Sequence, residues 1–484
     1  MADLLQVVDA ISASPTVLVN LADKTALSFK NFTAHPPQLR RTTSSSGAGD
    51  GDLLMAASYG DREIEFDLNV LTASNDTNST QLQLLARVLA NGDAWLKFQK
   101  DGSTNPVFFR TKRADITSIR EFWTRAGTRE IHLSIPCEPF AYGLPETGSF
   151  TITNDPTTGT NKMLASMPTI KGDVSTPLHL TFPTATAAHR IFVASQAAFD
   201  GTSLTAPYYK SLTAPTKNAS PPASVTITDT ADALFVSGTK RVLNGAVGTG
   251  LNTLVIPTAS QVQTWDNLPA GDYRVLVRGL TGAVTAPTET TIAFFNKAPL
   301  NGTTYTIDEA ALARTWPYQL SGAPQEWFDL GVAAMPGGAP ITDAAFALPG
   351  ATGTALWNVG VYDNNFPNVH LDAIVLVPAG RPNTITRHFL AAFPATYTSK
   401  AVTFDGITNR AFAVGTILSS STAVAAEDVA GSMPIVVPNA NNVLHFFAHV
   451  GVANPSRLTD TKATTTLITW KYHPRYIYDR PATT

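Results

Sequence analysis

The residues best suited to ligand chemistry lie in a polar segment between two apolar stretches, Tyr362-Asp-Asn-Asn-Phe-Pro-Asn-Val-His-Leu-Asp372. A second polar stretch upstream contains Trp316 and Tyr318. Aromatic rings stack on the apolar faces of sugars, and Asp and Asn side chains hydrogen-bond to hydroxyl groups. The pattern predicts glycan contact through the following side chains: Trp316, Tyr318, Asp363, Asn364, Asn365 and Asp372. An ordinary Asn/Asp-rich turn is the alternative, because these residues also form turns.

Two other residue types could serve chemistry. His445 and His449 would share one face of a strand, but a zinc ion would need a third ligand from elsewhere in the chain. The alternative is a pair of partly exposed strand histidines. The single cysteine, Cys137, occupies an apolar position in an alternating segment, which predicts a core residue rather than a nucleophile.

Local catalytic motifs do not occur in the sequence: it has no nucleophile elbow, zinc-protease helix, phosphate-binding loop or EF-hand. Catalytic carboxylates can pair across distant segments, so a glycan hydrolase stays open as an alternative. We predict that the protein is not an enzyme and has no catalytic residue, no metal and no cofactor.

The composition excludes several classes of protein. The 34 basic and 37 acidic residues give a net charge of −3, which does not fit a nucleic-acid binder. Only 15% of the residues are charged, against about 25% in an average domain, whereas Gly and Pro number 32 and 33. The start of the chain lacks the basic and apolar pattern of a signal peptide, and the long uncharged windows are rich in turn formers. We expect a protein made in a cytoplasm and not inserted into a membrane.

The first 145 residues contain the clearest patterns and 30 of the 71 charged side chains. Residues 62–70 alternate between apolar and acidic positions, which predicts a half-buried strand. Residues 79–91 change to helical spacing, and Gly92 stands where a helix often ends. Two hairpins follow, 95–98 with 107–110 and 116–123 with 129–137.

Beyond residue 145, short strand patterns recur every 10 to 20 residues between Pro, Gly and Asn breaks. This spacing favours sandwiches or jelly rolls over alternating strands and helices. The predicted fold class is therefore all-β: a β-sandwich with one helix, followed by further β-sandwiches.

The first domain resembles the hub domain of distal tail proteins of long-tailed, non-contractile bacteriophages. The similarity lies in "FDLNV…TQLQLLARVLANGDAWLKF", "VFFRTKRADI" and "IHLSIPCEPFAYG" within residues 60–145. The segments "ITNDPTTGTNKMLASMPTIKGD" and "MPIVVPNANNVLHFFAHV…ATTTLITWKYHPRYIY" resemble the entry and closing strands of the family's galectin-like domain. Between them, "AGDYRVLVRG", "QEWFDLGVAAMP" and "ALWNVGVYDNN" resemble a carbohydrate-binding-module-like jelly roll.

The resemblance implies three domains: a hub over 1–147, a galectin-like sandwich formed by 148–184 and 400–484, and an inserted jelly roll over 185–399. It also implies a homohexameric ring in the virion, at the tail tip, which joins the tail tube protein to the tip proteins. The outward domains would be available to host-surface glycans. Such a ring needs inter-subunit charges, for which the sequence offers six candidates: Glu63, Glu65, Asp67, Arg110, Arg113 and Arg120. A solvated strand face is the alternative for these residues.

Three other functions stay open at this stage. The chain could be a glycan-binding adsorption factor, another tail component such as a receptor-binding tip protein, or a tail-associated glycan hydrolase. A hub should oligomerise without sugar, a lectin should bind a glycan, and a hydrolase should lose turnover when one carboxylate is replaced.

Overall fold

The structure is a computed structural model. It describes residues 3–45, 52–71, 75–90, 92, 94–112, 118–120, 128–152, 154–155, 160–182, 188–199, 208–212, 225–231, 239–245, 253–255, 263–281, 289–300, 305–317, 327–336, 352–363, 369–380, 384–392, 401–406, 410–414, 424–425, 428–450 and 466–478. Apart from one α-helix and one turn of 3-10 helix, the regular structure of these residues consists of strands in antiparallel sheets. The all-β prediction is confirmed. No helix in the described ranges is long and apolar enough to cross a membrane.

The chain forms two compact units. Unit 1 contains Met1–Thr147, Ile170–Thr176 and Lys471–Thr484, and unit 2 contains Gly148–Thr169 and Pro177–Trp470. The first and last parts of the chain therefore belong to the same unit.

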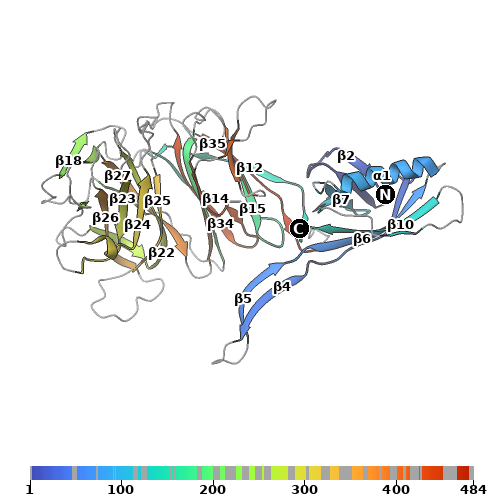
Figure 1. Ribbon diagram of the computed structural model, residues 1–484, viewed down its shortest axis with the longest axis horizontal. Helices are drawn as coiled ribbons and strands as arrows, with labels where there is room; N and C mark the ends of the chain where they lie inside the picture. The colour runs from blue at the N-terminus through green and yellow to red at the C-terminus, as the bar shows by residue number, and fades with distance from the viewer. Residues whose placement is uncertain are drawn as a thin grey trace. The chain divides into compact units, whose positions relative to one another are not determined.

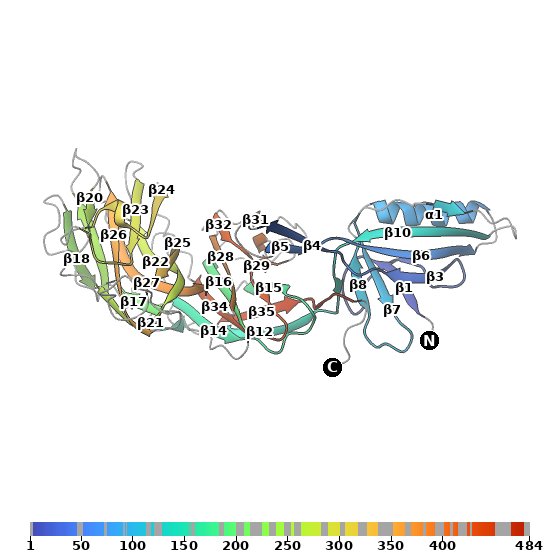
Figure 2. The same cartoon turned by 90° about the horizontal axis from the view of Figure 1, so that it is seen from below.

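Unit 1 is a sandwich of two sheets closed by one helix. The first sheet has the order β2 (Val17–Asn20), β1 (Leu4–Val8), β7 (Trp95–Gln99), β8 (Val107–Arg110), β11 (Ala141–Tyr142) and β36 (Arg475–Tyr476). The second has the order β3 (Leu27–Ala34), β6 (Arg62–Leu71), β10 (Thr128–Cys137) and β9 (Ser118–Arg120). Helix α1 (Asn75–Ala90) lies along the second sheet (Figure 2) and contributes Leu82, Leu85 and Leu89 to the core.

The predictions for this unit that depend on a single strand or turn are confirmed. β6 alternates between buried residues and residues that are half-buried or, at Glu63, exposed, with Ile64, Phe66 and Leu68 in the core. Gly92 has a φ of 71°, as a helix-ending glycine requires, and Cys137 is buried. Helix α1 begins four residues before the predicted range, because its first turn is polar and carries no apolar signal.

A two-stranded ribbon belongs to unit 1 but joins neither sheet. It consists of β4 (Leu39–Ser45) and β5 (Asp52–Tyr59), which pair only with each other among the described strands. Figure 1 shows the ribbon leading away from β6 and β10.

Unit 2 contains a discontinuous sandwich whose strands come from distant parts of the sequence. One sheet has the order β12 (Glu146–Ile152), β35 (Thr466–Tyr472), β15 (Thr176–Phe182), β29 (Ala401–Asp405), β30 (Arg410–Val414) and β31 (Val424–Ala425), with β33 (Ile435–Val436) paired to β15. The other has the order β13 (Asn154–Asp155), β14 (Thr160–Ser166), β34 (Asn441–Val450), β16 (Ala188–Ala198), β28 (Thr384–Ala392) and β32 (Asp428–Gly431). The rings of Phe182, Phe404 and Phe446 pack between these sheets, at centroid distances of 5.9 and 6.3 Å from Phe182.

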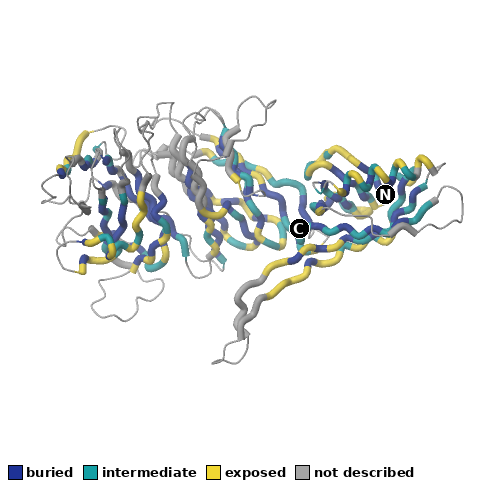
Figure 3. The backbone as a smooth tube through the Cα atoms, viewed as in Figure 1, coloured by how far each residue is buried: buried dark blue, intermediate teal, exposed yellow. Residues whose placement is uncertain are grey.

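An inserted sandwich fills the sequence between β16 and β28. Its first sheet has the order β18 (Val225–Ala231), β19 (Thr239–Gly245), β27 (Val369–Gly380), β22 (Gly271–Thr281) and β25 (Trp327–Met335), with β17 (Tyr208–Ser211) paired to β27. Its second has the order β20 (Thr253–Val255), β26 (Thr352–Asp363), β23 (Glu289–Phe295) and β24 (Leu312–Pro317), with β21 (Gln263–Pro269) paired to β26. Buried residues follow β27 over most of its length (Figure 3), and β22 contributes Tyr273 and Val275–Arg278.

The point of insertion differs from the range 185–399 given by the resemblance. β16 and β28 pair with each other from Arg190↔Ala392 to Ala198↔Thr384, and β16 also pairs with β34. Both strands are thus part of the discontinuous sandwich. We propose 199–383 as the limits of the inserted block, which then interrupts one antiparallel strand pair.

Candidate assembly surface and glycan-contact strands

The predicted acidic row of β6 lies on the polar face of the second sheet of unit 1. Asp67 accepts a hydrogen bond from Asn31 Nδ2 at 2.7 Å and lies 2.9 Å from His132 Nδ1. Glu65 lies 3.3 Å from His35 Nε2, and Ser134 donates a hydrogen bond to Glu63. All three carboxylates therefore have partners in their own subunit, from strands or turns beside β6.

Sequence reasoning missed the partners of these carboxylates. His132 lies directly opposite Asp67 in the β10–β6 register, and Ser134 lies opposite Glu65, diagonal to Glu63. That register joins residues more than sixty positions apart, so no local pattern reveals it. A neighbouring copy that met this face would find a hydrogen-bonded polar surface, in which each acidic side chain is already matched.

The predicted basic residues do not form one face. Arg110 lies on β8 in the six-stranded sheet, whereas Arg120 lies on β9 in the four-stranded sheet. Arg110 pairs with Glu138 at 3.0 Å and stacks over Trp95, with 5.9 Å between its guanidinium and the ring centroid. Arg113 lies outside the described residues, and only the backbone of Arg120 is described. The two predicted hairpins exist, but they belong to opposite sheets of the sandwich.

The predicted glycan residues converge partly at one end of the inserted sandwich. Trp316 on β24 and Asp363 on β26 are both register partners of Thr290 on β23, so the three residues form one row across the sheet. Asp372 lies on β27 in the other sheet, opposite the register shift between Arg278 and Gly279. Such bulges are common beside functional sites, because they redirect a side chain. The remaining three predicted residues lie outside the described residues: Tyr318, Asn364 and Asn365.

The topology explains why these positions share an end. β19, β22, β24 and β26 finish there, and β20, β23, β25 and β27 start there, as the pairs Thr253↔Asp363, Thr281↔Val369 and Arg278↔Trp327 show. Strand ends that carry an aromatic residue and a carboxylate in one row offer both the stacking residue and the acceptor that a sugar needs.

The described nucleophile and metal-ligand candidates have structural surroundings. Burial raises the pKa of Cys137 to about 12, so its thiol stays protonated. His445 is fully buried, which corrects the partly exposed reading, and its Nε2 lies 3.2 Å from Gln196 Oε1. Burial lowers the pKa of His445 to about 4. Within the described residues no three His, Cys, Asp or Glu side chains are grouped to hold a metal ion.

Comparisons with known proteins give similarities at the level of solved structures. No family model matches the chain, and no curated protein matches it. The structures to which it is similar include SPP1 Dit, described as a hub of the adsorption apparatus in phages infecting Gram-positive bacteria (12% identity, 80% of this chain, 99% of that chain, TM-score 0.28). They also include the phage p2 baseplate in its activated conformation (10% identity, 75% and 98% covered, TM-score 0.23).

A further similarity is to an exo-β-1,3-galactanase of Phanerochaete chrysosporium (10% identity, 71% and 69% covered, TM-score 0.17). At TM-scores this low, none of these likenesses carries a functional argument. The function is therefore inferred from the strands and contacts of the chain itself.

Proposed function

We propose that the chain is a structural protein of a phage tail, the hub that forms a sixfold ring at the distal end and joins the tube to the tip proteins. The proposal includes no reaction. It rests on the resemblance of residues 60–145 to tail hubs, together with one structural observation, the closure of unit 1 by the last described residues of the chain.

That closure depends on named contacts. β36 pairs with β11, and the guanidinium of Arg62 donates to the carbonyls of Pro139 and Ile477. Asp173 accepts a hydrogen bond from the backbone N–H of Ile477 at 3.0 Å. Gly172 has a φ of 116°, and an added Cβ would lie 2.9 Å from the carbonyl oxygen of Arg475. The segments 170–176 and 471–478, which belong to unit 1, are thus held together by these contacts.

This arrangement supports a hub because it separates assembly from everything inserted. A unit formed by the segments that precede and follow the other unit in the sequence can form a closed ring, while that other unit varies in size without altering the ring contacts. A ring closes by heterologous contacts, in which two different patches of each subunit meet around the axis.

The test is the native mass of the purified chain, with negative-stain images of the same sample. We expect a ring with a central hole and a mass of about 308 kDa, six times the chain's 51.4 kDa. A chain that stayed at 51.4 kDa at every concentration, even with the tube protein added, would contradict the proposal.

A second candidate function is glycan contact by the inserted sandwich, which the row of Trp316, Thr290 and Asp363 favours. On a glycan array, we expect a hit that W316A and D363A each weaken at least tenfold, as lost stacking and lost acceptors would do. T315A, next to Trp316 on β24, is the matched control. An array without a hit would leave the inserted sandwich as a spacer.

A further inference from the structure

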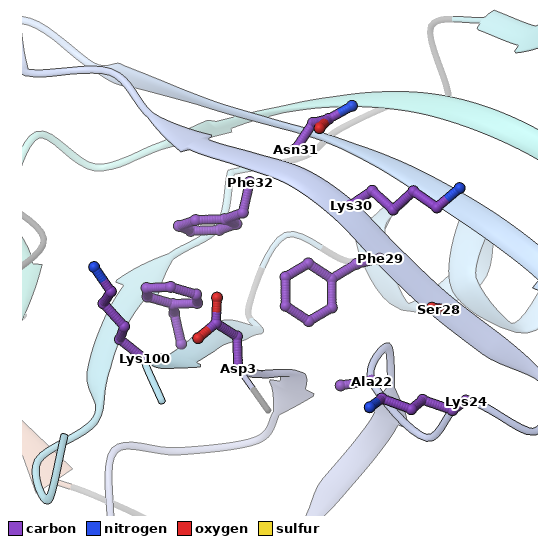
Figure 4. A pocket seen from close by; sticks show the side chains of 10 residues that line it. Asp3, Ala22, Lys24, Ser28, Phe29, Lys30, Asn31, Phe32 and Lys100 are labelled. Carbon is purple, nitrogen blue, oxygen red and sulfur yellow. The ribbon is translucent and has the colours of Figure 1, made fainter. Parts of the chain in front are cut away.

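Unit 1 contains a pocket of about 430 Å³ at the outer edge of β3, and its lining residue Asn31 also donates to Asp67 in the polar row of β6. Phe29, Phe32 and Phe98 line it, and the rings of Phe32 and Phe98 stack at a centroid distance of 4.1 Å. Figure 4 shows Phe29 and Phe32 facing the hollow, with Asp3 beside it. The floor of the pocket is therefore aromatic.

The rim of the pocket is basic. Lys24, Lys30 and Lys100 line it, and Asp3 is its only acidic side chain among the described residues. None of the three lysines forms an ion pair with another described residue, whereas Asp3 accepts a hydrogen bond from the backbone N–H of Asp101 at 2.7 Å. Three ammonium groups that form no ion pair with a described residue, placed around an aromatic floor, suit an occupant that combines carboxylates with apolar side chains.

The backbone around the pocket is held in unusual conformations. Lys24 and Asn31 have φ values of 61° and 53°, in the left-handed region that most residues avoid. Asn31 lies in the register shift of β3 between Lys30 and Thr33, and Asp23 accepts the backbone N–H groups of Thr25, Ala26 and Leu27 through one oxygen. The surrounding contacts therefore fix the pocket, so that an occupant would meet a preformed shape.

The same chain carries a segment of complementary chemistry at the tip of the β4–β5 ribbon. β5 begins Asp52-Leu53-Leu54-Met55, and Asp50 precedes it, so residues 42–59 contain two charges, both acidic. The ribbon's arginines, Arg40 and Arg41, lie at the opposite end, near its root. An isolated two-stranded ribbon is marginally stable in water, so its apolar residues need a covering surface.

The β4–β5 ribbon extends away from β3, the strand that lines the pocket, in its own subunit (Figure 2). Its root is anchored by Tyr59, whose ring meets Phe140 edge-on at 5.3 Å, and by a hydrogen bond from Gly60 N to the Gln38 carbonyl at 2.8 Å. From that root the paired strands extend about 20 Å to Ser45 and Asp52, at roughly 3.3 Å per residue. Pocket residues Ser28–Phe32 precede the root along the chain, and the ribbon leads away from the sheets (Figure 1).

We propose that the Asp52–Met55 segment of one subunit binds in the Lys24–Lys30–Lys100 pocket of the next subunit. The pocket and the ribbon tip are then the two patches of a heterologous contact, repeated around the ring. The aspartates meet the lysines, and the leucine and methionine side chains cover the phenylalanine floor. This inference rests on the proposed ring, which it supplies with a specific contact.

The first experiment measures the pocket without needing a ring. The receptor is the full chain carrying D50K and D52K, which leaves its pocket free of ribbons. The probe is a fluorescein-labelled peptide of residues 49–58. We expect saturable binding by fluorescence anisotropy, weakened at least tenfold by K30E/K100E and by raised salt. K97E is the matched control, because Lys97 lies on β7 beside Phe98 but on the opposite strand face.

The second experiment is a charge exchange read by native mass. D50K/D52K alone and K30E/K100E alone should each lose the ring, and the combination of all four substitutions should restore it. If the wild-type chain and both sets form rings equally well, the inference is wrong while the hub stands. If no variant forms a ring but the peptide binds and K30E/K100E abolishes binding, the pocket assignment stands and the ring does not. Failure of peptide binding together with unchanged rings would remove the pocket from the interface.

Discussion

Charged side chains are partly exposed on the polar face of unit 1 but mostly buried at the junction inside unit 2. On the β6 face, Asp67 and His132 pair with side chains 25% and 43% exposed. Where the two sandwiches of unit 2 meet, Arg274 pairs with Asp329, whose side chain is 4% exposed, and Arg278 is fully buried nearby on the same strand. Water can replace either partner of the first pair, whereas the Asp329 carboxylate of the second pair is almost closed to water. Removal of one partner should therefore cost much more stability at the junction than on the β6 face, although both pairs are in direct contact.

The junction is an apolar sheet contact with polar groups set into it. Phe192 and Ala194 of β16 pack against Leu276 of β22 and against Ala373, Val375 and Val377 of β27. β22 turns its odd-numbered residues into the core of the inserted sandwich and Leu276 toward β16. His388 of β28 bridges the layers, with its Nε2 3.3 Å from the carbonyl oxygen of Pro378. The inserted sandwich is thus packed onto the discontinuous sandwich, and its attachment does not depend on connecting segments alone.

The largest expected effect is loss of the buried carboxylate in D329A. The substitution leaves the mostly buried Arg274 guanidinium without its counter-charge, and we expect a cost of about 3–5 kcal/mol in the stability of the inserted sandwich. Hydrogen exchange of β22 and β25 measures it locally. D272A is the control, because Asp272 lies on the same strand with an exposed side chain. Equal protection in the two variants would show that the junction admits water.

A second effect follows from the two buried histidines of this junction and its neighbouring sheet. Burial and the nearby Arg274 charge lower the pKa of His388 to about 3, and burial lowers that of His445 to about 4. Between those values and the unfolded pKa near 6.5, the unfolded chain binds more protons, so stability is complete above about pH 6.5 and is lost as the pH falls.

We expect unit 2 to lose about 1.4 kcal/mol per pH unit for each imidazole below about pH 6.5. Hydrogen exchange of β28 and β34, corrected for the intrinsic rate at each pH, measures this slope. H445Q should remove about half of the slope, because it takes one proton-binding site away. A slope unchanged in H445Q would mean that other groups carry the acid sensitivity.

The contrast between the regions also explains how far sequence reasoning reached. β6, α1 and the turn at Gly102 were predictable, because each depends on a period or a turn within about fifteen residues. The two-sheet placement of Arg110 and Arg120 was not, because it depends on pairings between distant segments. The same limit applies to the assembly candidates, whose partners are His132 of β10 and His35, the residue after β3.

One available signal concerned the junction itself. The run Ala373–Val377 is apolar at every position, and alternate residues of it enter two different cores. A strand with one solvated face would alternate, so the run indicates that both faces of β27 are covered. The sequence could thus predict a second layer over β27, but not that β16 and β28 supply it, since nothing local identifies the partner of a buried strand.

The smallest expected effect is loss of the Asp67–His132 pair on the β6 face. A double-mutant cycle of D67A and H132A should give a coupling below about 1 kcal/mol in the isolated subunit, because solvent replaces either partner. The cycle is measured by unfolding unit 1 in urea. Hydrogen exchange of β7, whose Phe98 stacks on Phe32, reports the unfolding locally. Repeating it on the assembled ring sharpens the comparison. A coupling that stays small means that this face remains solvated in the ring. A rise to several kcal/mol on assembly would mean that the face is buried between subunits, and that its matched charges then resemble those of Arg274 and Asp329.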